Sequence, residues 1–288
     1  MESQKLVPKI NAVTCLLAFT FAICITGCES DKTPPAAVNS PAEDVFVQLR
    51  DAFAITEDEG ELLNNLKLIT DQQAETIIGA YETKFVTGPA LDPIGLPLNG
   101  LSSITNHQAE TLGKVRYHPP KDAYFCTLYL NGLTSINEEQ AKGLGKAESL
   151  ELNGLTSITD EQAKSLSRVE DLYLNGLTSI SDQQAESLSK VEYLYLNGLT
   201  SITDQQAESL NSGEGLETNI HQNNRYFIEL NGLTSISNQQ AESLSKVGNL
   251  ELEGLTSITD EQAKSLTNNL GKVATRLVIS DACYDVVS

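Results

Sequence analysis

The chain has 288 residues, which is enough for one or two ordinary domains. Lysine and arginine number 19 against 39 aspartates and glutamates, so the formal net charge is −20, which argues against binding to the phosphate backbone of nucleic acid. Hydrophobic residues make up 40% of the chain, enough for a core but too few for a protein that spans a membrane many times.

The N-terminal region is typical of an export signal. Lys5 and Lys9 precede the apolar stretch AVTCLLAFTFAICI, which is short for a membrane span. The stretch runs into ITGC, residues 25–28, which resembles a bacterial lipobox. This resemblance implies a lipoprotein signal peptide at residues 1–27, lipidation of Cys28, and an extracytoplasmic protein anchored in the bacterial cell envelope; an uncleaved anchor is the alternative. Residues 28–42 are mostly Pro, Ser and Ala, and we interpret them as a flexible tether.

After the tether, residues 43–62 are predicted to form an N-terminal helical cap, because the segment Asp44–Phe53 is amphipathic. From residue 63 to residue 270 one pattern recurs about eight times, and LYLNGLTSITDQQAESL, which begins at Leu194, is typical of it. The basic unit has 22 residues, with insertions near residues 79–97, 113–126 and 211–227. The run RLVIS, within residues 271–288, is predicted to be a strand that ends the series.

Each copy predicts a short strand, a turn and a short helix. The LYL run alternates with the period of a strand. The pair Asn197-Gly198 indicates a turn, in which the glycine is free to take a positive φ. Thr203 stands three residues before Gln206, the capping-box pattern of a helix start. A single unit cannot bury its leucines, whereas units stacked side by side bury them in one continuous core.

The pattern LxLxxLxxITDxxAxxL resembles leucine-rich repeats, and its ITD step is similar to the cysteine-containing subclass, with leucine here in place of the cysteine. The resemblance implies an α/β solenoid with a parallel sheet on the concave face and short helices on the convex face. It also implies binding, without naming the ligand. Some proteins of this subclass are ubiquitin-ligase adaptors that carry an F-box before the repeats. Here a lipobox and a tether occupy that place, which argues against this role.

The strand residues that flank the inward leucines are expected to point to the concave face and into solvent. Aromatic and acidic side chains gather there and form a candidate binding surface, since tyrosine is enriched at interfaces. The alternative interpretation is that the aromatics suit a pleated sheet and stack on their cross-strand neighbours. The candidate residues are Tyr129, Glu151, Asp171, Tyr173, Tyr193, Tyr195, Phe227, Glu229 and Glu251. Within this set, three tyrosines on two neighbouring strands form the predicted aromatic centre, with Asp171 and Glu229 at its acidic rim.

An asparagine follows most strands. We interpret this column as hydrogen bonding along the solenoid rather than as ligand contacts. The insertions contain His118 and His221, but the chain shows no metal-ligand spacing, no nucleophile elbow and no phosphate loop. We therefore predict no cofactor, no metal and no enzymatic activity. Cys126 and Cys283 are expected to lie six strand steps apart, too far for a disulfide.

These observations favour a membrane-anchored, non-enzymatic scaffold that binds a protein partner through its concave face and insert loops, without nucleic acid. A cell-envelope protein that binds glycans or acts as an adhesin is the first alternative. An enzyme with a site in the insert loops is the second.

Overall fold

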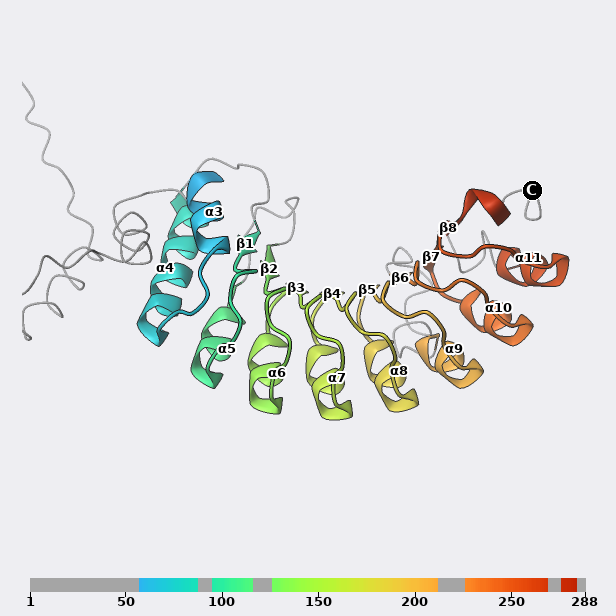
Figure 1. Cartoon of the computed structure of the whole chain (residues 1–288), viewed down its shortest axis with the longest axis horizontal. Helices are drawn as coiled ribbons and strands as arrows, with labels where there is room; N and C mark the ends of the chain where they lie inside the picture. Colours follow the sequence, from blue (N-terminus) through green and yellow to red (C-terminus); the bar gives the residue numbers. More distant parts are fainter. Residues whose placement is uncertain (1–56, 88–94, 116–125, 212–225, 269–275, 284–288) are drawn as a thin grey trace, which may run out of the picture. The chain divides into compact units, whose positions relative to one another are not determined.

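The computed structural model describes residues 57–87, 95–115, 126–211, 226–268 and 276–283, all of which belong to one compact unit, Ser40–Ser288. Within this unit, strands and helices alternate along the chain, and the strands lie on one side with the helices on the other (Figure 1). Several predictions concern residues outside the described ranges: the signal peptide, lipidation of Cys28, the tether, and the helix at Asp44–Phe53. The two insert histidines also lie outside them.

Eight parallel strands form one open sheet, and their order in the sheet is their order in the sequence. They are β1 (Leu96–Pro97), β2 (Thr127–Tyr129), β3 (Ser149–Glu151), β4 (Asp171–Tyr173), β5 (Tyr193–Tyr195), β6 (Phe227–Glu229), β7 (Asn249–Leu252) and β8 (Arg276–Ile279). The register pairs equivalent residues of successive repeats, for example Leu150 with Leu172. The expected solenoid of leucine-rich-repeat type is therefore confirmed, and the RLVIS run supplies its last strand.

A helix follows each strand except the last, and two helices precede the first strand. The α-helices are α3 (Glu57–Asn64), α4 (Asp71–Thr87), α5 (Asn106–Leu112), α6 (Glu138–Leu144), α7 (Asp160–Leu166), α8 (Asp182–Leu188), α9 (Asp204–Leu210), α10 (Asn238–Leu244) and α11 (Asp260–Thr267), and a short 3₁₀ helix, η1 (Asp281–Cys283), follows β8. Helix α3 occupies the position in the first repeat that a strand occupies in the later repeats. Helix α4 continues through residues 79–87, so this part of the first predicted insertion is helix and not loop.

One continuous core runs between the sheet and the helices. In the repeat that contains β5, Leu194, Leu196 and Leu199 are fully buried, and so is Ala207 on the helix. The small alanine lets the helix approach the strand closely, as the sequence pattern predicts. The equivalent leucines and alanines of the other repeats join the same cluster, so each repeat completes the core of its neighbour.

Each short helix begins with the predicted capping box, and its glutamine also reaches the preceding repeat. In α5 the backbone N–H of Thr105 donates to Oε1 of Gln108 (2.9 Å), and the backbone N–H of Gln108 donates to the threonine Oγ1 (3.1 Å). The Nε2 of Gln108 donates to the carbonyl of Ile69, 2.8 Å away. The same contact to the preceding repeat is made by Gln140, Gln162, Gln184, Gln206, Gln240 and Gln262. We call this series the glutamine ladder.

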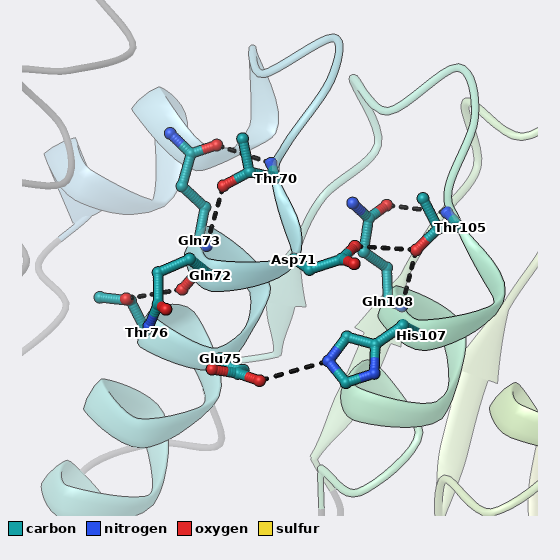
Figure 2. A network of polar contacts seen from close by, with 9 residues as sticks. All are labelled: Thr70, Asp71, Gln72, Gln73, Glu75, Thr76, Thr105, His107 and Gln108. Atoms are coloured by element: carbon teal, nitrogen blue, oxygen red, sulfur yellow. Dashed lines mark hydrogen bonds and ion pairs between the residues drawn. The ribbon is translucent and has the colours of Figure 1, made fainter.

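Side chains of neighbouring helices add polar contacts on the helix side, as Figure 2 shows for α4 and α5. Thr105 Oγ1 donates to Oδ1 of Asp71 at 2.9 Å, so the capping residue of one helix contacts the first turn of the previous one. His107 Nε2 lies 3.2 Å from Oε1 of Glu75. Both residues of the second pair are about half exposed, so this pair contributes little to stability.

The turn glycines are required by close packing and not by an unusual backbone angle. Gly198 does not use the positive φ that is open to glycine. A Cβ added at Gly198 would lie 2.3 Å from the carbonyl oxygen of Asn175 and 2.5 Å from that of Leu177. Successive turns pack against each other so closely that no side chain fits between them.

The two cysteines of the folded part are free and buried. Cys126 immediately precedes β2 and contacts the hydroxyl of Tyr81 on α4, whereas Cys283 follows β8. Burial raises the pKa of the Cys126 thiol to about 12, so this thiol stays protonated and unreactive at neutral pH.

Candidate functional site

The side chains that point outward from the sheet form two rows across the strands. The first row holds Thr127, Ser149, Asp171, Tyr193, Phe227, Asn249 and Arg276, and the second row holds Tyr129, Glu151, Tyr173, Tyr195, Glu229, Glu251 and Val278. Neighbours within a row are about 4.8 Å apart at the backbone. All nine candidate binding residues lie in these two rows, which together we call the strand face.

Four aromatic side chains of the strand face touch one another, and we call Tyr173, Tyr193, Tyr195 and Phe227 the aromatic cluster. The rings of Tyr173 and Tyr195 stack with centroids 3.9 Å apart and planes 7° apart. Phe227 packs at a tilt against Tyr195 (5.3 Å) and Tyr193 (6.4 Å). The sequence predicted side chains open to solvent, but the rings are half-buried because they cover one another. The stacking interpretation is therefore correct about the contacts, and it leaves the outer parts of the rings accessible.

Burial also affects the ionisation of the stacked pair. Desolvation raises the pKa of Tyr173 and of Tyr195, and a hydrogen bond between the two side chains raises the value for Tyr173 further. Both hydroxyls are therefore neutral at physiological pH. The pair presents a flat, uncharged aromatic surface.

Tyr129 stands apart from this cluster. In the second row it is separated from Tyr173 by Glu151. Its ring lies over the backbone of Gly95, where an added Cβ would come within 2.0 Å of the ring's Cε2 atom. The sequence placed Tyr129 on the correct face but could not show that its ring packs on Gly95, which directly precedes β1.

The asparagine column forms a ladder of hydrogen bonds, which confirms the structural interpretation. The backbone N–H of Asn153 donates to Oδ1 of Asn131 at 2.8 Å, and that of Asn175 donates to Oδ1 of Asn153 at 2.9 Å. The remaining steps join Asn64 to Asn99, Asn99 to Asn131, Asn175 to Asn197, Asn197 to Asn231 and Asn231 to Glu253. These asparagine oxygens are therefore occupied within the fold.

The asparagine ladder fixes two glutamates of the second row. Glu151 Oε2 accepts from the amide nitrogens of Asn131 (2.9 Å) and Asn153 (3.2 Å). Glu229 Oε1 accepts in the same way from Asn197 (2.7 Å) and Asn231 (2.8 Å). In each glutamate one carboxylate oxygen is held by two amides, and among the described residues the other oxygen has no hydrogen bond or ion pair. Both side chains are half-buried, so they are fixed in direction rather than freely moving.

Glu251 differs from these two because the chain supplies it with a cation. Nη2 of Arg276, in β8, lies 3.1 Å from Oε1 of Glu251. Burial raises the pKa of the Glu251 carboxyl, while Arg276 lowers it and thereby favours the charged form. Among the three glutamates of the second row, Glu251 is thus the one that forms an ion pair with a described residue.

Asp171 is not part of an exposed acidic rim, contrary to the prediction. It is 8% exposed, and its Oδ1 has no hydrogen-bond partner among the described residues. Its pKa is raised to about 7, chiefly by burial and then by the nearby Glu170 and Glu192, while a hydrogen bond with Ser149 opposes the shift. A buried carboxyl lacks the water that would stabilise its charged form.

On the helix side, a polar groove of about 440 Å³ lies between α7 and α8. It is lined by Asp160, Glu161, Lys164, Gln183, Glu186, Ser187 and Lys190. Its lining is charged or polar throughout, without the aromatic groups found on the strand face.

Within residues 57–283, as far as they are described, no group of three or more His, Cys, Asp or Glu side chains is placed to hold a metal ion. None of the helices described there is long and apolar enough to cross a bilayer. Comparisons of the sequence with known protein families and with curated proteins found no match.

Proposed function

We propose that this protein is an exported, lipid-anchored scaffold without catalytic activity that binds a protein partner through its strand face and its insert loops. The observation that supports this most is the aromatic cluster, which combines a large apolar area with carboxylates on both sides along the second row. Clustered aromatic side chains that lose little entropy on binding are typical of the energetic centres of protein interfaces.

A scaffold role is also what the fold favours physically. The leucines, the alanines, the glutamine ladder and the asparagine ladder account for the residues that recur in every repeat. The strand face is where the copies differ, with tyrosine, glutamate, aspartate, serine and threonine at equivalent positions. Stacking alone does not require this variety, whereas recognition of a particular partner does.

A glycan ligand is the second candidate, because a flat tyrosine ring offers a stacking surface to a sugar. A glycan also needs several free hydrogen-bond donors and acceptors. The asparagine oxygens are used by the ladder, and the amides of Asn131, Asn153, Asn197 and Asn231 are used by the two glutamates. A protein partner therefore fits the surface better.

The lipid anchor in this proposal comes from the ITGC sequence and Cys28, with the export signal before it. An anchor followed by a tether would present the folded repeats to partners outside the cytoplasm while keeping them near a membrane. The acidic charge of the chain agrees with a partner that carries a positively charged surface.

The test compares three forms of the full chain as bait in a cross-linking capture from envelope extract. The first is wild type, the second carries Tyr173→Thr and Tyr195→Thr, and the third carries Gln183→Ala, at an exposed position of α8. Threonine suits a strand, so the double variant should keep its fold by circular dichroism.

The proposal requires that the proteins captured by wild type are lost with the double variant and retained with the Gln183 variant. If a folded double variant captures the same proteins at full yield, binding through the strand face is wrong and the insert loops become the better candidate. The same three forms are also applied to a glycan array. If binding to glycans depends on Tyr173 and Tyr195 while capture of proteins does not, the glycan ligand is favoured.

A further inference from the structure

The second row places two fixed carboxylates on either side of the stacked tyrosine pair. Along this row the order is Glu151, Tyr173, Tyr195, Glu229, on the consecutive strands β3 to β6. The inner ring faces of the two tyrosines cover each other. Along the row Tyr173 is next to Glu151 and Tyr195 is next to Glu229, and Phe227 packs at a tilt against Tyr195. Each glutamate thus lies beside an aromatic ring and keeps one oxygen without a described partner.

A carboxylate beside a tyrosine ring is suited to a guanidinium group. The planar guanidinium of arginine stacks on an aromatic face and at the same time donates hydrogen bonds to a carboxylate. The amides of the asparagine ladder fix the direction of each glutamate in advance, so little side-chain freedom is lost when a cation arrives.

The same chain already places a guanidinium against a carboxylate of the second row, one strand further along. Arg276 of β8 lies 3.1 Å from Glu251, which is the next residue of the second row after Glu229. The structure thus contains one guanidinium on this row of carboxylates. Glu151 and Glu229 are equivalent positions at which the described residues provide none.

We propose that the partner engages the strand face with two arginines spaced four residues apart in an extended segment, one on Glu151 beside Tyr173 and the other on Glu229 beside Tyr195. This inference rests on the proposed function and specifies the partner's chemistry. The residue midway between the arginines is apolar and lies over the stacked rings. The motif is Arg-x-apolar-x-Arg.

The spacing follows from the sheet. Three strand steps of about 4.8 Å separate β3 from β6, which gives about 14 Å between the two glutamates along the row. In an extended chain, residues four apart point to the same side and are about 13 Å apart at 3.3 Å per residue. The residue two positions along lies about 7 Å from each arginine, which is the middle of the tyrosine pair. Three residues of separation would instead turn one arginine away from the face.

The experiment uses three synthetic peptides of identical composition, acetylated and amidated, with a fluorophore at the N-terminus. Peptide GRSLSRG carries the arginines four apart, GRSLRSG three apart, and GRRSLSG adjacent. Binding to the full chain is measured by anisotropy at about 0.15 M salt, which screens unspecific attraction between a basic peptide and an acidic protein. GRSLSRG is expected to bind at least about tenfold more tightly than either of the others.

Two variants connect the preference to the residues. Glu151→Gln with Glu229→Gln keeps an oxygen for the asparagine amides but removes both negative charges, so it should abolish the preference for GRSLSRG. Glu242→Gln removes one charge from the exposed side of α10, away from the strand face, and should leave the preference unchanged. The inference is wrong if the three peptides bind wild type within twofold of one another, or if the double glutamine variant still prefers GRSLSRG.

The outcome of this test is separable from that of the capture experiment. If capture depends on the two tyrosines but no peptide preference is seen, the strand face binds a partner of other chemistry and only the arginine inference fails. If capture does not depend on the tyrosines, the proposed function fails, whatever the peptides do.

Discussion

Replacing Gln184 by alanine should weaken the solenoid, because this side chain makes two hydrogen bonds that no other group replaces. Its Oε1 accepts from the backbone N–H of Ser181 at 2.9 Å, and its Nε2 donates to the carbonyl of Ile158 at 2.8 Å. The side chain is 9% exposed. Alanine at this position removes both bonds but leaves the other half of the capping box, since the serine Oγ still accepts from the backbone of residue 184.

The magnitude follows from what each lost bond leaves behind. A buried carbonyl without a partner, here that of Ile158, costs about 2 kcal/mol, and the more accessible N–H of Ser181 costs about 1 kcal/mol. The higher helix propensity of alanine offsets less than about 0.5 kcal/mol of this loss. The expected decrease in the free energy of unfolding is therefore about 2 to 3 kcal/mol.

The matched control is Gln183→Ala, in the next position of the same helix. Gln183 is exposed, and its side chain bonds only to Glu186 on the surface, at 3.0 Å. Its replacement should change the free energy of unfolding by less than about 0.5 kcal/mol. Urea denaturation followed by far-UV circular dichroism measures both variants. If the two variants unfold at the same urea concentration, the glutamine ladder does not stabilise the stack as argued.

Three further predictions concern other parts of the chain. Asp171 has a folded-state pKa of about 7, above the ordinary value of 3.8, so its contribution to stability is fully present below pH 3.8 and is lost as the pH rises through 7. Asp171→Asn should therefore lose less stability than wild type between pH 5 and pH 8 in thermal melts, and identical pH profiles would contradict this. Gly198→Ala should destabilise by about 2 kcal/mol or more because of the 2.3 Å approach to Asn175, whereas Gly79→Ala, in α4 with no heavy atom within 4 Å, should stabilise slightly, and effects of equal sign would refute the packing argument. Radiolabelled palmitate should enter the wild-type chain but not Cys28→Ala, and equal labelling of both would exclude lipidation at this cysteine.

The fold was predictable from the sequence because one unit recurs and each copy contains the signals for its own strand, turn and helix. The leucine spacing gives the core, and the capping box gives the helix start. The double role of Gln206, which also donates to the carbonyl of Ile180, was not predictable, because the carbonyl belongs to another repeat and only stacking brings it near. The requirement for glycine at position 198 was not predictable either, because the atoms that exclude a side chain belong to the turn of the preceding repeat.

The candidate site was predicted in part. Alternation along each strand placed every candidate residue on the strand face, and the equivalent positions in neighbouring repeats gave the cross-strand pairs. Burial could not be read in this way. Asp171 and Tyr173 share a strand and both point outward, yet one is buried and the other half-buried, a difference that alternation along the strand does not provide. The fixing of Glu151 by two asparagines likewise depends on side-chain directions that spacing does not provide.

The ladders have a consequence for how such a chain can change in length. Asn131 contacts Asn99 at 2.9 Å although 32 residues separate them, and Asn153 contacts Asn131 at 2.8 Å across 22 residues. The same contact forms whether 22 or 32 residues lie between the two asparagines. Segments of different length can therefore be accommodated between repeats without loss of register. Duplication of one 22-residue segment would therefore add a complete strand and helix, preserve every hydrogen bond between repeats, and move the two ends of the strand face apart by about 4.8 Å. A surface of this kind can be lengthened in equal steps by recombination between its own copies, with each added strand contributing two new outward positions for selection to vary.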